Sequence, residues 1–361
     1  MPEAPLKTSR LRTLTFAEAI REATEQAMTK DEGTIIMGLG VPDPKGIFGT
    51  TLGLKEQFGD ERVMDMPASE NGMTGVAIGA ALNGLRPIMT HQRVDFALLA
   101  LEQIINQAAK WHYMFDGKSK VPLVIRMIIG RGWGQGPQHS QSLQSFFAHV
   151  PGLKVVMPFS PHDAKGLLLA SIEDDNPVIF MEHRWLHNLA GPVPEDYYTV
   201  PLGIAEIKRP GKDITIASVS HMTYEALRAA AVLDSGGISV EVIDIRSLKP
   251  LDAACIVASL KKTGRLMVLD TGWKTCGFAG ELVALAAEQC LSSLKSPPIR
   301  ITLPEYPLPT SPALSRNYYP GLRQIVQKGL TLMGEADLRL EIPDMVRIPH
   351  DVPDLGFKGP F

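Results

Sequence analysis

Short apolar segments alternate with segments of helical periodicity along nearly the whole chain, and this alternation limits the fold more than any other feature. In the first half, the apolar segments predict strands over 34–38, 62–66, 87–90, 123–129, 155–158 and 178–181. Helices are expected from residue 14 onward, where Thr15 and Glu18 have the spacing of a capping box, and over 54–58, 72–85, 96–114 and 164–173. Strands that alternate with helices predict an α/β domain with a mostly parallel sheet flanked by helices.

The alternation pauses between Gly191 and Pro201, where the composition shifts to Pro, Gly, Glu, Asp and Tyr, and then resumes. The second series predicts strands over 214–219, 239–243 and 265–269, and helices over 224–233, 253–261, 277–291 and 322–332. A chain of 361 residues is also long for a single core. We therefore expect two α/β domains, at 14–192 and 200–333, with an N-terminal extension over 1–13 and a C-terminal tail over 334–361.

Charge and cysteine usage exclude several classes of protein. Lysine and arginine number 36 against 39 aspartates and glutamates, so the basic excess of a nucleic-acid-binding protein is missing. The three cysteines lack metal-ligand spacing, and we expect neither a disulfide framework nor a zinc site. The polar N-terminus and the lack of an apolar run of about 18 residues predict neither a signal peptide nor a membrane span. We expect a bacterial cytoplasmic protein; the mitochondrial matrix is the less favoured location.

Three local features are candidates for chemistry, and each has a plainer alternative. The glycines of 130–136 follow a predicted strand, but Gln135 stands where a dinucleotide loop needs its third glycine. His139 follows this loop and suits proton transfer, although the local sequence by itself favours a helix cap or a solvent-facing position. Glu70 precedes the small-residue helix over 72–85; it is either a desolvated carboxyl group or an ordinary helix-N-terminal carboxylate.

Taken in order, the motifs of this chain resemble the β subunit of thiamine-diphosphate-dependent 2-oxoacid dehydrogenases of the pyruvate and branched-chain type. The matching segments are Glu70 with its small-residue helix, Gly84–Ile88, Gln92–Phe96, Gln103–Lys110, Gln138–Ser142, Phe147–Val156, Asp174–Pro177, Val242–Pro250, Lys262–Arg265 and Gly272–Trp273. They extend over nearly the whole of 14–332. The resemblance implies a transketolase pyrimidine-binding domain followed by a transketolase C-terminal-like domain.

The resemblance also implies roles for single residues. Glu70 matches the carboxyl group that shares a proton with N1′ of the cofactor aminopyrimidine. Phe96 matches the aromatic ring that stacks on this aminopyrimidine, and Gln92 lies in the same cofactor-binding segment. His139 matches the histidine that assists acyl transfer. A structural potassium ion is implied at the positions of Leu123, Ser171, Ile172, Asp174 and Asn176, largely through backbone carbonyls.

The chain lacks the motif by which thiamine enzymes bind Mg²⁺ and the diphosphate, a Gly-Asp-Gly followed by a downstream Asn. The nearest match, Phe115–Gly117, lacks the first glycine. Mg²⁺ requires oxygen ligands, and the sequence offers no such set. In the family a separate α subunit supplies this half of the site, so the resemblance implies an α₂β₂ assembly that is active only with the α partner, and a possible lipoyl acyltransferase as a further partner.

At three positions the chain departs from the family pattern. Leu39 replaces a glutamate that faces the cofactor region in most β subunits, and Arg93 and His91 stand where the family is usually apolar or small. We expect a substrate or acceptor pocket that relays protons less well and attracts anionic groups more strongly.

The leading hypothesis is therefore a β subunit that takes part in decarboxylating a 2-oxoacid and transferring the acyl unit. A transketolase-like carboligase that passes a two-carbon unit to a carbonyl compound, such as a sugar, is the main alternative. A non-catalytic scaffold subunit would not need Glu70, Phe96 and His139 together. A dinucleotide-dependent oxidoreductase is the least supported reading.

Overall fold

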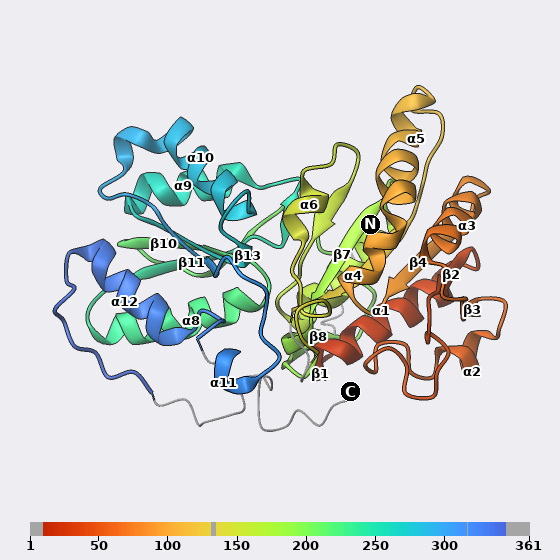
Figure 1. Ribbon diagram of the computed structural model, residues 1–361, viewed down its shortest axis with the longest axis horizontal. Coiled ribbons are helices and arrows are strands. Elements are labelled where there is room, and N and C mark those ends of the chain that lie inside the picture. The colour runs from red at the N-terminus through yellow and green to blue at the C-terminus, as the bar shows by residue number, and fades with distance from the viewer. Residues whose placement is uncertain (1–9, 131–134, 316, 344–361) are drawn as a thin grey trace, which may run out of the picture.

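The computed structural model describes residues 10–130, 135–315 and 317–343, which form two α/β units side by side (Figure 1). The first unit carries a seven-stranded sheet and the second a five-stranded sheet. The α/β class with mostly parallel sheets is thus confirmed. None of the helices in the described residues is long and apolar enough to cross a membrane.

The sheet of the first unit has the strand order β12-β6-β7-β5-β4-β2-β3, and every neighbouring pair is parallel except β12 with β6. Its strands are β2 (Thr34–Met37), β3 (Val63–Met64), β4 (Arg86–His91), β5 (Val124–Ile129), β6 (Lys154–Val156), β7 (Val178–His183) and β12 (Ser247–Lys249). The parallel arrangement brings the carboxyl ends of β2 to β7 to one edge of the sheet.

Helices cover both faces of this sheet, because successive strand residues point to opposite sides. Ile36 packs with α1 (Phe16–Lys30) and α7 (Pro161–Glu173), whereas Ile35 packs with α3 (Glu70–Leu82) and the long helical segment after β4. That segment consists of α4 (Val94–Ala97), a 3₁₀ turn (Leu98–Ala100), a π-helical stretch (Gln103–Ala108) and α5 (Ala109–Met114). The small residues of α3 permit a close approach: a Cβ at Gly75 would lie 3.3 Å from the Gln103 Oε1.

The second unit has the strand order β14-β13-β10-β11-β9, with only β9 antiparallel. Its strands are β9 (Glu206–Arg209), β10 (Ile214–Ser218), β11 (Val240–Asp244), β13 (Leu266–Trp273) and β14 (Ile299–Leu303). Figure 1 shows α9 (Ala253–Thr263) and α10 (Phe278–Cys290) on one side of this sheet, and α8 (His221–Ser235) and α12 (Leu322–Met333) on the other. The shorter helices of the chain are α2 (Leu54–Phe58), α6 (Gln144–Ala148), two 3₁₀ turns (Arg184–Leu186 and Leu291–Ser293) and α11 (Pro312–Ser315).

The two units share one apolar core. Residues of α9 and α10 belong to the same buried cluster as residues of α3 and β5. Polar contacts join the units as well: Gln144 Nε2 donates to the buried Asp270 Oδ1 at 2.6 Å, and the Phe278 backbone N–H donates to Ser145 Oγ at 2.8 Å. Because β12 of the second half also extends the first sheet, the units are interlocked rather than loosely linked.

The periodic segments were predicted well and the short edge elements were not. The capping box at the start of α1 is confirmed, since Thr15 and Glu18 exchange both hydrogen bonds. The expectation of an unstructured stretch from Gly191 is wrong at its start, because β8 (Ala190–Pro194) pairs antiparallel with β1 (Leu11–Thr15). The expected regular helix over 96–114 is interrupted by 3₁₀ and π-helical turns.

The beginning of the C-terminal tail packs against the second unit instead of leaving it. Leu340 and Ile342 are partly buried on the cluster formed by α8, α12 and the second sheet. The rest of the tail, 344–361, lies outside the described residues, as do 1–9 of the expected N-terminal extension and 131–134 of the glycine-rich loop.

Candidate active site

A pocket of about 660 Å³ lies at the carboxyl edge of the first sheet, beside the segments that follow β2, β4 and β5. Its wall is formed by Asp43, Pro44, Lys45, Gly46, Ile47, Phe48, Gln92, Arg93, Phe96, Gln135 and His139. Ligands of parallel α/β sheets bind outside the carboxyl ends of the strands. The position of the pocket therefore makes it the candidate active site.

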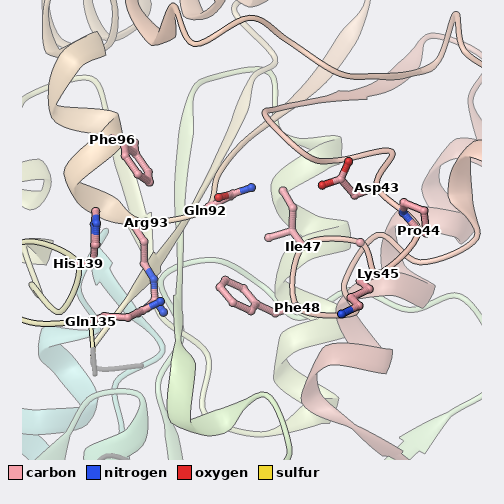
Figure 2. Close-up of a pocket in the computed structure, with 11 residues that line it drawn as sticks. Asp43, Pro44, Lys45, Ile47, Phe48, Gln92, Arg93, Phe96, Gln135 and His139 are labelled. Carbon is pink, nitrogen blue, oxygen red and sulfur yellow. The ribbon is translucent and has the colours of Figure 1, made fainter. Parts of the chain in front are cut away.

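The pocket has two walls of different origin. Figure 2 shows Asp43, Pro44, Lys45, Ile47 and Phe48 on one side and Phe96, Arg93, His139 and Gln135 on the other, with Gln92 between them. The first wall belongs to the long loop between β2 and α2. The second is built by the turn after β4 and by the segment that follows β5.

The loop that forms the first wall is fixed by its own threonines. Thr50 Oγ1 donates to the Ile47 carbonyl at 2.7 Å, and Thr51 Oγ1 donates to the Val41 carbonyl at 2.9 Å. Both threonines are buried. Phe48 has φ of +50°, in the left-handed region that a bulky residue seldom adopts. These bonds hold the loop in a strained shape that turns Phe48 into the pocket.

A buried ion pair lies beneath this loop. Arg126 on β5 and Glu182 on β7 are both fully buried; Arg126 Nε donates to Glu182 Oε1 at 2.6 Å and Nη2 to Oε2 at 3.1 Å. Arg126 Nη2 also donates to Thr50 Oγ1 at 2.9 Å. The His187 ring, 3.4 Å from Glu182 Oε2, lies near Phe48 with ring centroids 6.0 Å apart. The pair thus connects the centre of the sheet to the pocket wall.

His139 lies in the second wall beside an aspartate and an aromatic ring. Its Nδ1 is 2.8 Å from Asp95 Oδ2, and its ring centroid is 5.4 Å from that of Phe96. Asp95 fixes the orientation of the imidazole and favours a proton on Nδ1, which leaves Nε2 for a ligand. The geometry therefore favours an oriented proton-transfer group over a helix cap or a solvent-facing histidine.

Gln92 joins the ends of β2 and β4. Its Nε2 donates to the backbone carbonyl of Leu39 at 2.8 Å, and its side chain lines the pocket. The strand ends approach closely here, since a Cβ at Gly38 would lie 2.3 Å from the Thr90 carbonyl oxygen. Leu39 itself is 37% exposed and does not belong to the pocket wall. It contacts the site through its backbone.

Of the two basic residues expected in the pocket, only Arg93 lines it. His91 is buried behind the wall, and burial lowers its pKa to about 4. His91 is thus neutral at pH 7, and the expectation that it adds positive charge is wrong. Burial, reinforced by the nearby Arg184, lowers the Arg93 pKa to about 9, so Arg93 remains charged at pH 7.

Glu70 is the first residue of α3. The loop that leads into α3 leaves the carboxyl end of β3, at the same sheet edge as the pocket. Only 7% of it is exposed, yet its carboxylate makes no hydrogen bond or ion pair with any other described residue. It lies outside the wall of the 660 Å³ pocket. Two strand spacings, about 10 Å, separate the ends of β3 and β4. Glu70 is therefore a residue of low exposure whose carboxylate pairs with no other described residue.

The residues implied for a potassium ion surround the turn between α7 and β7. Arg86 Nη1 donates to the carbonyls of Ile172 at 3.0 Å and Asp174 at 3.2 Å. The Asp174 carboxylate pairs with Lys154, and its Oδ1 accepts from the Asn176 backbone N–H at 2.9 Å. Each carbonyl oxygen has a second lone pair. A monovalent cation fits here only with these backbone oxygens as its ligands. No group of three or more His, Cys, Asp or Glu side chains in the described ranges could hold a metal ion.

Sequence reasoning missed one whole wall of the pocket. The loop residues Asp43 to Phe48 carry no motif, and Asp95 was noticed only as part of a longer match. One signal was available: the irregular stretch after the first strand is rich in Pro and Gly, and loops at strand carboxyl ends carry sites. The Pro- and Gly-rich composition indicates that a loop lies at the site, but it does not show which of its side chains face the ligand.

Comparisons with known proteins agree with this geometry. The family described as "Transketolase, pyrimidine binding domain" matches residues 12–188, and "Transketolase, C-terminal domain" matches residues 203–325. A solved structure titled "Split gene transketolase, inactive beta4 tetramer" superposes with a TM-score of 0.71 at 23% identity, covering 88% of this chain and 99% of that one. This last likeness shows the shared fold.

Curated relatives are similar over nearly their whole length. The chain is 45% identical to the acetoin:2,6-dichlorophenolindophenol oxidoreductase subunit beta of Bacillus subtilis (strain 168), covering 91% of this chain and 99% of the relative. It is 40% identical to the pyruvate dehydrogenase E1 component subunit beta of Rickettsia felis, covering 87% and 96%. It is also 40% identical to the 2-oxoisovalerate dehydrogenase subunit beta of Bacillus subtilis (strain 168), covering 84% and 94%.

Proposed function

This chain belongs to the transketolase-like family of E1 β subunits that these relatives represent, and from that premise we propose a specific role for it. It is the β subunit of a heteromeric thiamine-diphosphate enzyme that decarboxylates a 2-oxoacid and passes the acyl unit on. The domain at 14–192 contributes the pyrimidine half of the site, and the domain at 200–333 supports it. The observation that carries the proposal is the grouping of Gln92, Phe96 and the oriented His139 in one wall, with an unused, buried Glu70 at the same sheet edge.

The residues present fit the pyrimidine half of thiamine diphosphate. When bound, thiamine diphosphate would supply a thiazolium whose deprotonated C2 carbon can add to a carbonyl carbon, and whose cationic ring can take up the electron pair left behind when carbon dioxide departs. Glu70 holds a proton at N1′ of the aminopyrimidine, for which its unpaired carboxyl group is suited. Phe96 offers a flat apolar ring for stacking, and Gln92 offers amide donors and acceptors.

His139 acts on the transferred group rather than on the cofactor. With Asp95 bound to Nδ1, Nε2 can give a proton to, or accept one from, an oxygen or sulfur atom in the pocket. Asp95 is a positioning residue that fixes the orientation of the ring. This division leaves Glu70 to the cofactor and His139 to the acceptor.

The proposal requires an α subunit. The described residues offer no oxygen-ligand cluster for Mg²⁺, so we assign the Mg²⁺ and diphosphate ligands to a partner chain in an α₂β₂ assembly. The three free cysteines, Cys255, Cys276 and Cys290, suit the reducing cytoplasm that we propose as the location. A potassium ion at the α7–β7 turn is part of the proposal; replacing KCl by NaCl at equal ionic strength should then lower the midpoint of thermal unfolding.

The acceptor divides the proposal into two candidates. A lipoyl group on an acyltransferase is the acceptor in the leading one. A carbonyl compound, such as a sugar, is the acceptor in the second; the positive charges of Lys45 and Arg93 in the pocket wall favour it where that compound carries an anionic group. Assays of one 2-oxoacid with lipoamide and with carbonyl acceptors would separate the two.

Calorimetry with thiamine diphosphate and Mg²⁺ tests the heteromer directly. The chain should bind the cofactor when mixed with an α partner that carries Gly-Asp-Gly and the downstream Asn, and 2-oxoacid decarboxylation should then appear. The purified chain alone should show no measurable binding. Micromolar binding by the chain alone would contradict the assignment of the diphosphate half to a partner.

A further inference from the structure

We propose that Arg93 forms an anion-binding subsite in the pocket wall, which takes a carboxylate or phosphate group carried by the donor or acceptor. The subsite lies between the turn after β4 and the loop that carries Phe48. The identification of the ligand as a substrate rests on the proposed function; the presence of an anion site does not.

The first observation is that Arg93 is buried with most of its donors unused. It is 3% exposed, and its Nη1 donates to the Gly130 carbonyl at 3.2 Å. Its Nε and Nη2 are buried and meet no hydrogen-bond acceptor among the residues that the structure describes. An unpaired buried charge is unfavourable unless a ligand or partner group compensates it. Arg93 is thus a buried cation with two hydrogen-bond donors unused and no direct ion pair among the described residues.

The unused nitrogens form one edge of the guanidinium. This is the edge that can donate two parallel hydrogen bonds to a carboxylate. The same chain shows this geometry elsewhere, since Arg126 uses its Nε and Nη2 to hold the two oxygens of Glu182. Carboxylate and phosphate share the required pair of oxygens. Because Nε and Nη2 of Arg93 are buried in this structure, an anion reaches them only when neighbouring groups shift.

The charges around Arg93 favour an anion over a cation. The guanidinium carbons of Arg93 and Arg184 lie 5.2 Å and 4.5 Å from the centroid of the Phe48 ring, so two cations gather around one aromatic ring. Lys45 adds a third positive charge at the pocket, against the single carboxylate of Asp43 in the wall. Asp95, the other nearby carboxylate, is already engaged with His139.

The subsite is separate from the proposed place of the cofactor diphosphate, which is assigned to the α partner. A donor or acceptor that occupies it therefore carries an anionic group away from the reacting carbonyl carbon. A lipoyl group or a neutral hydroxyketone has no such group to offer.

Isothermal titration of the full chain, alone and with its α partner, tests the subsite. The probes are inorganic phosphate and succinate at constant ionic strength. We expect at least one probe to bind, and Arg93→Ala to weaken that binding about 10- to 100-fold, which corresponds to one lost charge-assisted contact. Arg93→Lys should retain part of the affinity, because it keeps the charge but loses the paired edge. Arg323→Ala, which removes an exposed arginine on α12, should bind as the wild type does.

Equal binding of both probes to the wild type and Arg93→Ala, alone and in the complex, would overturn the subsite. A second pair of results would also overturn it: Arg93→Ala no longer associates with the α subunit, and the wild-type complex binds neither probe. Arg93 would then pair with a carboxylate of the partner. The titrations need no cofactor. Failure of the proposed function would appear separately, as absence of cofactor-dependent decarboxylation in a wild-type complex that still binds the probe.

Discussion

Replacing Glu182 by glutamine should destabilise the first unit and loosen the pocket loop together. Glu182 is fully buried and accepts both hydrogen bonds of the Arg126 edge. Burial raises its pKa, but the charge and hydrogen bonds of Arg126, together with the nearby His187 ring, outweigh burial and lower the pKa to about 2. Glu182 is therefore ionised at pH 7, and Glu182→Gln leaves the Arg126 charge buried without its counterion.

Removing one partner of a buried pair costs about 3–5 kcal/mol, whereas replacing both partners by apolar residues is often nearly neutral. We therefore expect Glu182→Gln to lower the free energy of unfolding by about 3–5 kcal/mol. The double variant Arg126→Met/Glu182→Leu should lose much less. In the double variant Thr50 still loses its bond from Arg126, so the pocket loop should remain loosened even where stability is recovered.

Urea unfolding of the isolated chain, followed by circular dichroism, measures the first effect. Hydrogen exchange of the amides of residues 41–51 measures the second, and both variants should exchange faster there than the wild type does. A loss below about 1 kcal/mol in Glu182→Gln would show that the buried charge is compensated in another way. Unchanged exchange in both variants would show that Arg126 does not hold the loop.

Two further predictions concern the other wall. Asp95→Asn removes the charge that orients His139. Because this pair is partly exposed, we expect a roughly tenfold fall in kcat, with unchanged proton exchange at C2 of the cofactor. Loss of C2 exchange would instead link Asp95 to the cofactor. Burial lowers the pKa of His91 from 6.5 to about 4, so the unfolded chain binds the proton first and stability falls as pH drops from about 6.5 to 4. His91→Leu should reduce this pH-dependent loss in the free energy of unfolding by up to about 3 kcal/mol, since a change of one in pKa corresponds to about 1.4 kcal/mol. Urea unfolding at pH 7 and pH 4 measures the loss. An equal loss in the variant and the wild type would contradict the neutral, buried imidazole.

Elements with strong periodicity could be predicted because the spacing of their apolar residues shows which residues are buried. Phe16, Ile20 and Ala27 recur on one face of α1, and all three are buried there as expected. Strands β1, β8 and β12 were missed because their pairing partners lie far away in the sequence. The three residues of β12 are also too few to show a period in the sequence.

The candidate site was predictable only where a family motif marks it. His139 and Phe96 were found by their motifs, and the structure places them in one wall. Arg93 was noticed as a departure, but its unused guanidinium edge depends on packing against Phe48 from a different loop. His91 looked like a second cation until its burial was known, because charge in a sequence says nothing about desolvation.

Proton exchange at C2 of thiamine diphosphate tests the central claim most directly. It should be measured in the complex of this chain with its α partner, comparing the wild type with Glu70→Gln and, as a matched carboxylate-to-amide control beside His139, Asp95→Asn. An amide cannot share a proton with N1′ as a carboxyl group can, so we expect exchange to be abolished in Glu70→Gln, with cofactor still bound, and preserved in Asp95→Asn. Exchange in Glu70→Gln at more than a few per cent of the wild-type rate would contradict the assignment of Glu70 and the account of the site built on it.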